Sequence, residues 1–225
     1  YVSADLTIEP GAVLQMASGT FIEVESEGSL HAQGSATYPI LFTGVQWTRG
    51  YWDGLWYTAS DDVKNVLDYV TVEYAGGWSS GDDYGNVIVR GGSRVLITNS
   101  TLRQSSAYGL HAYDNAILTG FANNLLTLNQ MGAAQMDADL VGYLDEASTY
   151  SGNVDDIVNV TGGTIARDQT WPGIDAEYYV FATVAVTGAW VVSPGAWLVF
   201  NSGQYIWVTT GSLHAVGTTT AGITF

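Results

Sequence analysis

The sequence predicts an all-β protein in which short parallel strands wind into a solenoid, and three observations indicate this fold. Apolar residues alternate with other residues in short runs, which is the period of a β-strand. Turn-forming pairs such as Pro10-Gly11 and Ser18-Gly19 bound these runs. The residue pattern of Leu6–Phe42 recurs in Trp190–Phe225. A long internal repeat is the signature of a repeat architecture.

The two copies agree along their length. Gly28-Ser29-Leu30-His31-Ala32 returns unchanged as Gly211–Ala215, with one residue fewer in the second copy. Evenly spaced strands also occur in barrels and sandwiches, but runs this short inside a repeated unit favour a coil with three strands per turn. The residues expected to point into the core are apolar in both copies: Leu14, Ile22, Val24, Leu30, Ile40 and Phe42 in the first, and Leu198, Ile206, Val208, Leu213 and Ile223 in the second.

The chain between the copies continues the coil. An aromatic stretch at 45–60 is followed by strand patterns at 66–74, 86–90, 94–102, 110–113 and 116–128. Asn99, Asn123, Asn124 and Asn129 fall at bends between these patterns, where stacked Asn side chains can cap turn backbones.

Residues at about 131–177 follow the strand pattern least. We expect an excursion from the coil here, with a short helix over Leu140–Ala147, before the pattern resumes at Tyr178. Because both flanks share one pattern, the sequence predicts a single domain over residues 1–225.

The repeated motif resembles a known family. The pattern LTIxPGxxLxxxxG, then a strand, GSLxAxGT and PIxFT, lies at Leu6–Thr43 and again at Trp190–Phe225. It is similar to the repeats of bacterial and archaeal cell-surface proteins with a right-handed parallel β-helix, which belong to the broad pectate-lyase-like superfold. The resemblance implies that fold and a secreted, extracellular location at the cell surface. It specifies no activity, because the superfold hosts many functions.

Composition and net charge disfavour several classes of binding partner. The net charge is −16, with only 6 Lys and Arg residues, so nucleic acid and anionic membranes are disfavoured. The absence of cysteine excludes disulfides and thiol chemistry. The sequence shows no signal peptide and no apolar run long enough to span a membrane, so we expect no membrane insertion.

Carboxylate pairs are the candidates for chemistry. The resemblance implies an Arg or Lys base beside calcium-binding Asp in lyases, or clustered Asp in hydrolases. The pairs here are Asp61-Asp62, Asp82-Asp83 and Asp155-Asp156. Neighbours on a strand point in opposite directions, so we expect no catalytic dyad and no enzyme. We expect no other cofactor than calcium, for which Asp82, Asp83, Asp155 and Asp156 are the candidate ligands.

The three histidines suggest no site. His31 and His214 occupy the same position of the repeat and are expected to face outward, and His111 stands alone.

The function that the sequence favours is structural. A solenoid with open ends exposes unpaired strand backbone, so we expect end-to-end stacking of copies into a filament. The alternative is a carbohydrate-binding or polysaccharide-cleaving β-helix, because 8 Trp and 14 Tyr provide faces on which sugars stack.

The outward residues differ between the copies. Thr7, Val13, Gln15 and Glu23 correspond to Val191, Trp197, Val199 and Trp207, so we expect an apolar patch on the second copy. Three alternatives would cover it: the 131–167 stretch, another subunit, or a sugar. The candidate interface residues on the sides and ends of the coil are Leu6, Ile8, Trp190, Val191, Trp197, Val199, Trp207, Ile223 and Phe225.

Overall fold

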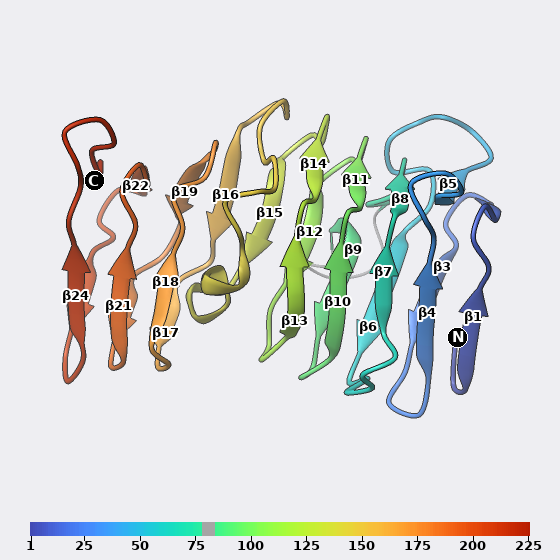
Figure 1. The fold of residues 1–225 in the computed structure, drawn as a ribbon, viewed down its shortest axis with the longest axis horizontal. Helices are drawn as coiled ribbons and strands as arrows, with labels where there is room; N and C mark the ends of the chain where they lie inside the picture. The colour runs from blue at the N-terminus through green and yellow to red at the C-terminus, as the bar shows by residue number, and fades with distance from the viewer. Residues whose placement is uncertain (78–83) are drawn as a thin grey trace.

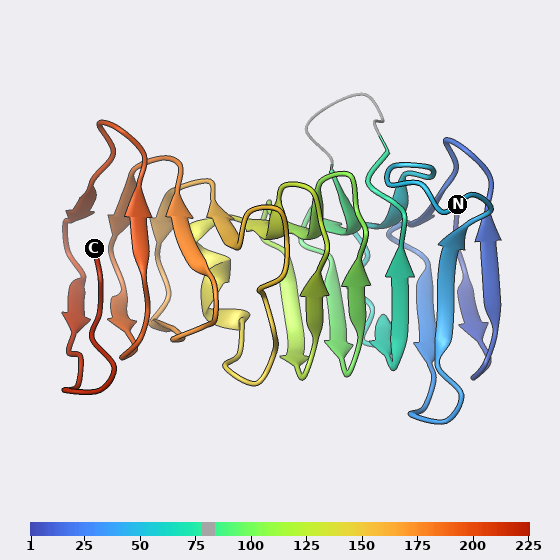
Figure 2. The same ribbon diagram turned by 90° about the horizontal axis from the view of Figure 1, so that it is seen from above.

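The computed structural model describes residues 1–77 and 84–225 and shows an all-β solenoid of about nine turns (Figure 1). All five sheets are parallel, and strands of successive turns lie side by side (Figure 2). The two chain ends lie at opposite ends of the coil (Figure 1). The predicted parallel β-helix is therefore confirmed. Within the described residues, no helix is long and apolar enough to cross a membrane.

One sheet, which we call sheet A, runs the length of the coil. Its eight strands come from successive turns, and each pairs in parallel with the next. In spatial order they are β3 (Phe21–Val24), β6 (Gly54–Thr58), β9 (Gly85–Arg90), β12 (Tyr108–Ala112), β15 (Gly132–Met136), β16 (Ile157–Val160), β19 (Glu177–Val180) and β22 (Leu198–Phe200).

Two further sheets complete the N-terminal coils. Each has five strands, and the chain passes from sheet B to sheet C to sheet A in every turn. Sheet B contains β1 (Asp5–Ile8), β4 (Ser29–Gln33), β7 (Val66–Asp68), β10 (Arg94–Thr98) and β13 (Ile117–Ala122), and sheet C contains β2 (Val13–Met16), β5 (Ile40–Gly44), β8 (Val70–Glu73), β11 (Thr101–Arg103) and β14 (Leu125–Thr127).

The C-terminal coils use two new sheets beside sheet A. In each C-terminal turn the chain passes from sheet A to sheet D and then to sheet E, before it returns to sheet A. Sheet D contains β17 (Gly163–Ile165), β20 (Val184–Val186) and β23 (Ile206–Val208), and sheet E contains β18 (Gln169–Trp171), β21 (Ala189–Val192) and β24 (Ser212–Ala215).

A single 3-10 helix, η1 (Ala138–Tyr143), separates the two sets of side sheets in the described chain. It packs against β13 on one side and against β17 and β18 on the other. Leu140 and Val141 are both buried, whereas a strand would direct two consecutive side chains to opposite faces. The helix begins and ends earlier than the sequence suggested.

The 131–177 stretch does not leave the coil. β15 and β16 pair in register across it, with Ala134 opposite Val158 and Met136 opposite Val160. The expected excursion is thus one modified turn, in which η1 takes the place of a side strand while sheet A continues.

The core is a continuous apolar column inside the strands. Of the predicted inward residues, Val24, Leu30, Ile40, Phe42 and Leu198 are buried. Leu14, Ile22, Ile206, Leu213 and Ile223 are partly buried and pack against that core. Val208 lies opposite the buried Val186 in the strand register, on the inward side of β23, but its side chain is 42% exposed because β23 is the outermost strand of sheet D.

Asparagine and serine side chains tie the corners together, as predicted for Asn124 and Asn129. The Asn129 side chain accepts a hydrogen bond from the Ser105 N–H at 3.0 Å and donates one to the Leu102 carbonyl at 3.1 Å. Asn124 makes the equivalent pair of bonds to Ser100 and Ile97 at the other corner. These contacts satisfy backbone groups that the turns leave without strand partners.

The two sequence repeats occupy different sheets. Leu14 lies in sheet C, but its counterpart Leu198 lies in sheet A. Ile22 lies in sheet A, but its counterpart Ile206 lies in sheet D. The second copy is therefore displaced by one face around the coil.

Candidate functional site

A cleft of about 840 Å³ opens on the outer side of sheet A. Its floor comes from the middle strands β12, β15 and β16, and its rim comes from the segments beside them. The lining residues that the structure describes are Tyr84, Tyr108, His111, Tyr113, Met131, Gln135, Asp137, Asn159, Thr161, Phe181 and Ala182.

Three polar side chains form a ladder across the floor. His111, Gln135 and Asn159 are direct neighbours in the register of β12, β15 and β16. The Asn159 Nδ2 donates to Gln135 Oε1 at 2.9 Å, and Gln135 Nε2 lies 3.0 Å from His111 Nε2. Hydrogen bonds that run from one strand to the next hold the three groups in a fixed line.

Aromatic rings stand beside the ladder. The hydroxyl of Tyr108 accepts a hydrogen bond from Asn159 Nδ2 at 3.1 Å. The Tyr113 ring lies 4.6 Å from the His111 ring, and the Phe181 side chain is 54% exposed at the rim. Burial raises the pKa of Tyr108, so its hydroxyl stays neutral at physiological pH.

The cleft carries little charge. Asp137 is the single carboxylate among its described lining residues, which include no Lys or Arg. Asp137 accepts hydrogen bonds from the Thr161 hydroxyl at 2.7 Å and from the Asp114 N–H at 3.1 Å. Glycoside hydrolysis by the common mechanisms uses two carboxyl groups that flank the bond. This arrangement suits the binding of a polar, uncharged molecule.

The acidic pairs have structural partners. Asp156 Oδ1 accepts a hydrogen bond from the Asn153 N–H at 2.7 Å. The Asn153 side chain in turn accepts one from the Asn129 N–H, so Asp156 lies at the end of a row of hydrogen-bonded corner residues. Asp155 is exposed. Asp61 pairs with Arg94 at 2.6 Å. Over residues 1–77 and 84–225, no three His, Asp or Glu side chains gather as a metal site would require. Asp82 and Asp83 lie outside the described residues.

The prediction that Trp190 is an interface residue is wrong. Its side chain is fully buried and packs against Trp171, with ring centroids 4.6 Å apart. Trp190 lies on the inner side of β21 and pairs in register with Leu213 of the next turn. A neighbouring turn of the same chain covers this indole, so it cannot anchor another subunit.

Trp197 and Trp207 both point outward, with 49% and 59% of their surface exposed. They do not form one patch, because Trp197 borders sheet A whereas Trp207 lies in sheet D. The 131–167 stretch therefore buries neither indole.

The other predicted interface residues fall into two groups. Leu6, Ile8 and Ile223 are half-buried and pack against the core, and Phe225 is 58% exposed. Val191 and Val199 are half-buried. End-to-end stacking through these residues stays a prediction.

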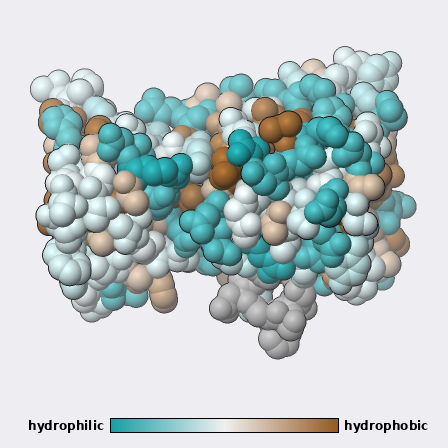
Figure 3. Space-filling model, turned by 90° about the horizontal axis from the view of Figure 1, so that it is seen from below, coloured by the Kyte–Doolittle hydropathy of each residue, from teal (hydrophilic) through white to brown (hydrophobic). Residues whose placement is uncertain are grey.

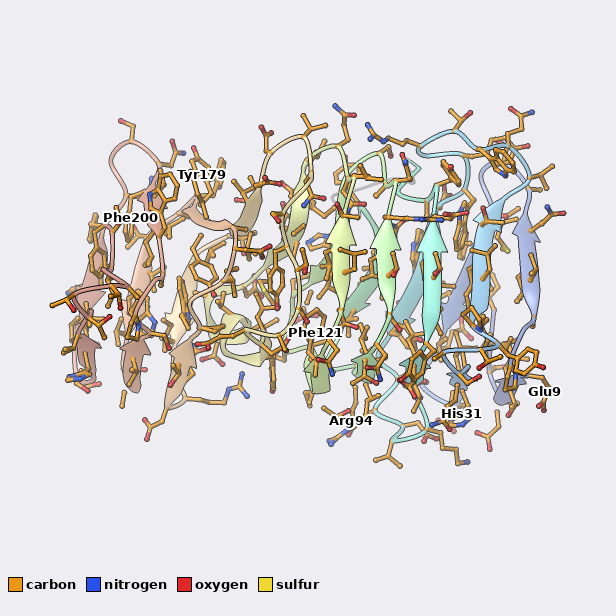
Figure 4. The ribbon with its side chains drawn as sticks, turned by 45° about the horizontal axis from the view of Figure 1, so that its top comes forward. Glu9, His31, Arg94, Phe121, Tyr179 and Phe200 are labelled. Atoms are coloured by element: carbon orange, nitrogen blue, oxygen red, sulfur yellow. The ribbon has the colours of Figure 1, made fainter. Side chains whose placement is uncertain are left out.

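His31 and His214 lie in different sheets, B and E, because the two repeats are displaced around the coil. His214 is exposed and His31 is half-buried. Figure 4 shows His31 and Arg94 along one edge of the N-terminal coils, away from Tyr179 on the C-terminal coils.

The strand pattern of the sequence does not reveal the ladder. It leaves His111 isolated and singles out neither Gln135 nor Asn159. The available signal is spacing, since the ladder residues are 24 positions apart. The same spacing of 24 joins Ser105 to Asn129 and Asn129 to Asn153. One turn of the coil in this region is therefore 24 residues long, and residues at that interval become neighbours.

Comparison with protein-family models, with curated proteins and with solved structures finds no match. The fold and the geometry of the cleft are therefore the basis for a functional proposal.

Proposed function

We propose that this protein is an extracellular β-helix that binds an uncharged glycan in the sheet A cleft without cleaving it. The ladder of His111, Gln135 and Asn159 is the observation that carries the proposal. The extracellular location rests on the resemblance of the repeat to cell-surface β-helices.

The chemistry of the cleft matches that of a sugar. Pyranose rings present hydroxyl groups at their edges and C–H groups on their faces. Amide side chains both donate and accept hydrogen bonds, so Gln135 and Asn159 can pair with hydroxyls. Phe181 offers an exposed ring on which a sugar face can stack.

One polar atom of the floor lacks a partner. Asn159 Oδ1 is buried and receives no hydrogen bond from the described residues. A buried acceptor without a donor costs free energy, which a ligand hydroxyl would recover if the Asn159 side chain turned this oxygen toward the cleft. The scarcity of charge in the lining favours neutral glycans over polyuronates, whose carboxylates would face Asp137 and find no described Lys or Arg there.

The test is titration calorimetry with neutral polysaccharides (xylan, mannan and β-glucan) and with polygalacturonate. We expect binding to at least one neutral polymer and none to polygalacturonate. Gln135→Ala should weaken binding at least about 10-fold, since it breaks the ladder at its centre. Gln15→Ala is the matched control, because this exposed glutamine lies on sheet C.

Two outcomes would overturn the proposal. One is the absence of binding to every neutral polymer, and the other is unchanged affinity in Gln135→Ala. Release of reducing ends or unsaturated products would show an enzyme instead of a binding protein.

A second candidate is the structural role, with copies of the chain associating into an assembly. The exposed indole of Trp207 favours it.

A further inference from the structure

Charge is distributed unevenly along the coil. Every Asp, Glu, Lys and Arg of the chain lies within residues 1–177, so residues 178–225 contain none of the charge that sums to −16. Figure 3 shows the consequence on one side of the molecule: the C-terminal end at the left is mostly pale, while hydrophilic residues gather over the middle.

Two large aromatic side chains lie on this uncharged part. Tyr205 and Trp207 alternate with the inward Ile206 on and beside β23, and they are 57% and 59% exposed. Ala185 of β20 lies beside Trp207 in the strand register. We call the outer surface formed by Thr183, Ala185, Tyr205 and Trp207 the aromatic face.

Trp197 stands in a different setting. It lines a pocket together with Asp156, Asp175 and Glu177. Two copies that met through Trp197 would bring these carboxylates together, which costs free energy. Trp197 therefore does not belong to the aromatic face.

We infer that the aromatic face binds the same face of a second copy of this chain and forms a closed dimer. Tyr and Trp are the residues most enriched in the centres of protein interfaces. A contact of one face with its own copy is two-fold symmetric and closes at two subunits.

The uneven charge distribution favours the C-terminal coils as the place where two copies meet. Two bodies of net charge −16 repel each other, and contact through the uncharged C-terminal coils keeps the acidic coils furthest apart. β23 and its neighbour β20 carry no charged residue, so a contact between two aromatic faces places no like charges of these strands against each other.

Sedimentation velocity over a concentration series, without any glycan, tests the dimer. We expect a monomer–dimer equilibrium whose dissociation constant increases at least about 10-fold in Trp207→Ser. Trp47→Ser is the matched control, because Trp47 is 78% exposed and lies in the acidic part of the chain. Circular dichroism verifies that each variant is folded.

Two charge variants identify the partner surface. Ala185→Glu and Ala185→Lys should both weaken a contact of the aromatic face with itself, since each places like charges across the two-fold axis. If the partner were the acidic coils of another copy, Ala185→Lys would strengthen association while Ala185→Glu weakened it.

Three results would overturn the inference. They are a monomer at every concentration up to the millimolar range, association that persists unchanged in Trp207→Ser, and opposite effects of the two Ala185 variants. Gln135→Ala should dimerise as the parent does, so failure of the glycan proposal would leave this result unaffected.

Discussion

The N-terminal and C-terminal coils wrap the same kind of core in different ways. The N-terminal coils secure their corners with Asn and Ser side chains and carry ion pairs such as Arg103–Glu73, at 2.6 Å. The C-terminal coils fill their core with Trp171, Trp190 and Tyr178. The indole N–H groups of both tryptophans have no acceptor among the described residues. Inward alternation is thus sufficient to build a turn of the coil, and corners and surface are free to differ.

The largest expected difference comes from one substitution made at the same position of both repeats. Leu30 is fully buried, whereas its counterpart Leu213 is only partly buried on the outermost strand of sheet E. Leu30→Asp should destabilise the protein by at least about 4 kcal/mol, because it buries an unpaired charge. Leu213→Asp should cost about 1 kcal/mol. Urea unfolding followed by circular dichroism measures both, and equal losses would show that the two ends are equivalently packed.

The corner side chains offer a second contrast. Asn129→Ala should cost about 1–3 kcal/mol, since it leaves the Ser105 N–H and the Leu102 carbonyl without partners. At a C-terminal corner, the Asn201 side chain donates to the Phe181 carbonyl at only 3.4 Å and accepts from the adjacent Ser202 N–H at 2.8 Å, and both bonds are exposed. Asn201→Ala should therefore change stability by less than about 0.5 kcal/mol. A similar cost at both sites would mean that the corners of the two regions are held alike.

Two buried tyrosines give a smaller contrast. The Tyr178 hydroxyl donates to the Pro172 carbonyl at 2.8 Å, whereas no described residue hydrogen-bonds to the Tyr57 hydroxyl. Tyr178→Phe should therefore lose about 1 kcal/mol, and Tyr57→Phe should lose nothing or gain up to about 1 kcal/mol. Thermal melts of the two variants measure this difference. A loss in Tyr57→Phe as large as that in Tyr178→Phe would contradict it.

The same tyrosines predict the response to alkali. Burial raises the pKa of Tyr57 and of Tyr178 above the ordinary value of 10.0. The folded state therefore holds these protons more tightly than the unfolded state does. Their contribution to stability is complete below pH 10 and is lost as the pH rises further. Melting temperatures should be level up to about pH 9 and should fall above about pH 10, less steeply in Tyr57→Phe.

The sequence by itself determined the coil. Period-two alternation and turn glycines are local properties, and the repeat can be read directly from the sequence. Together they predicted the inward positions of Leu30, Phe42 and Leu198 and the corner role of Asn129. None of these features requires knowledge of which strands pair.

Only the tertiary structure decided which surfaces meet. Alternation distinguishes inside from outside, but it does not say which sheet a strand joins or which turn covers it. For that reason Trp190 is buried while Trp197 is exposed, and Trp207 lies on a different sheet from Trp197. The cleft arises in the same way, because His111, Gln135 and Asn159 become neighbours only when the length of each turn brings β12, β15 and β16 into register.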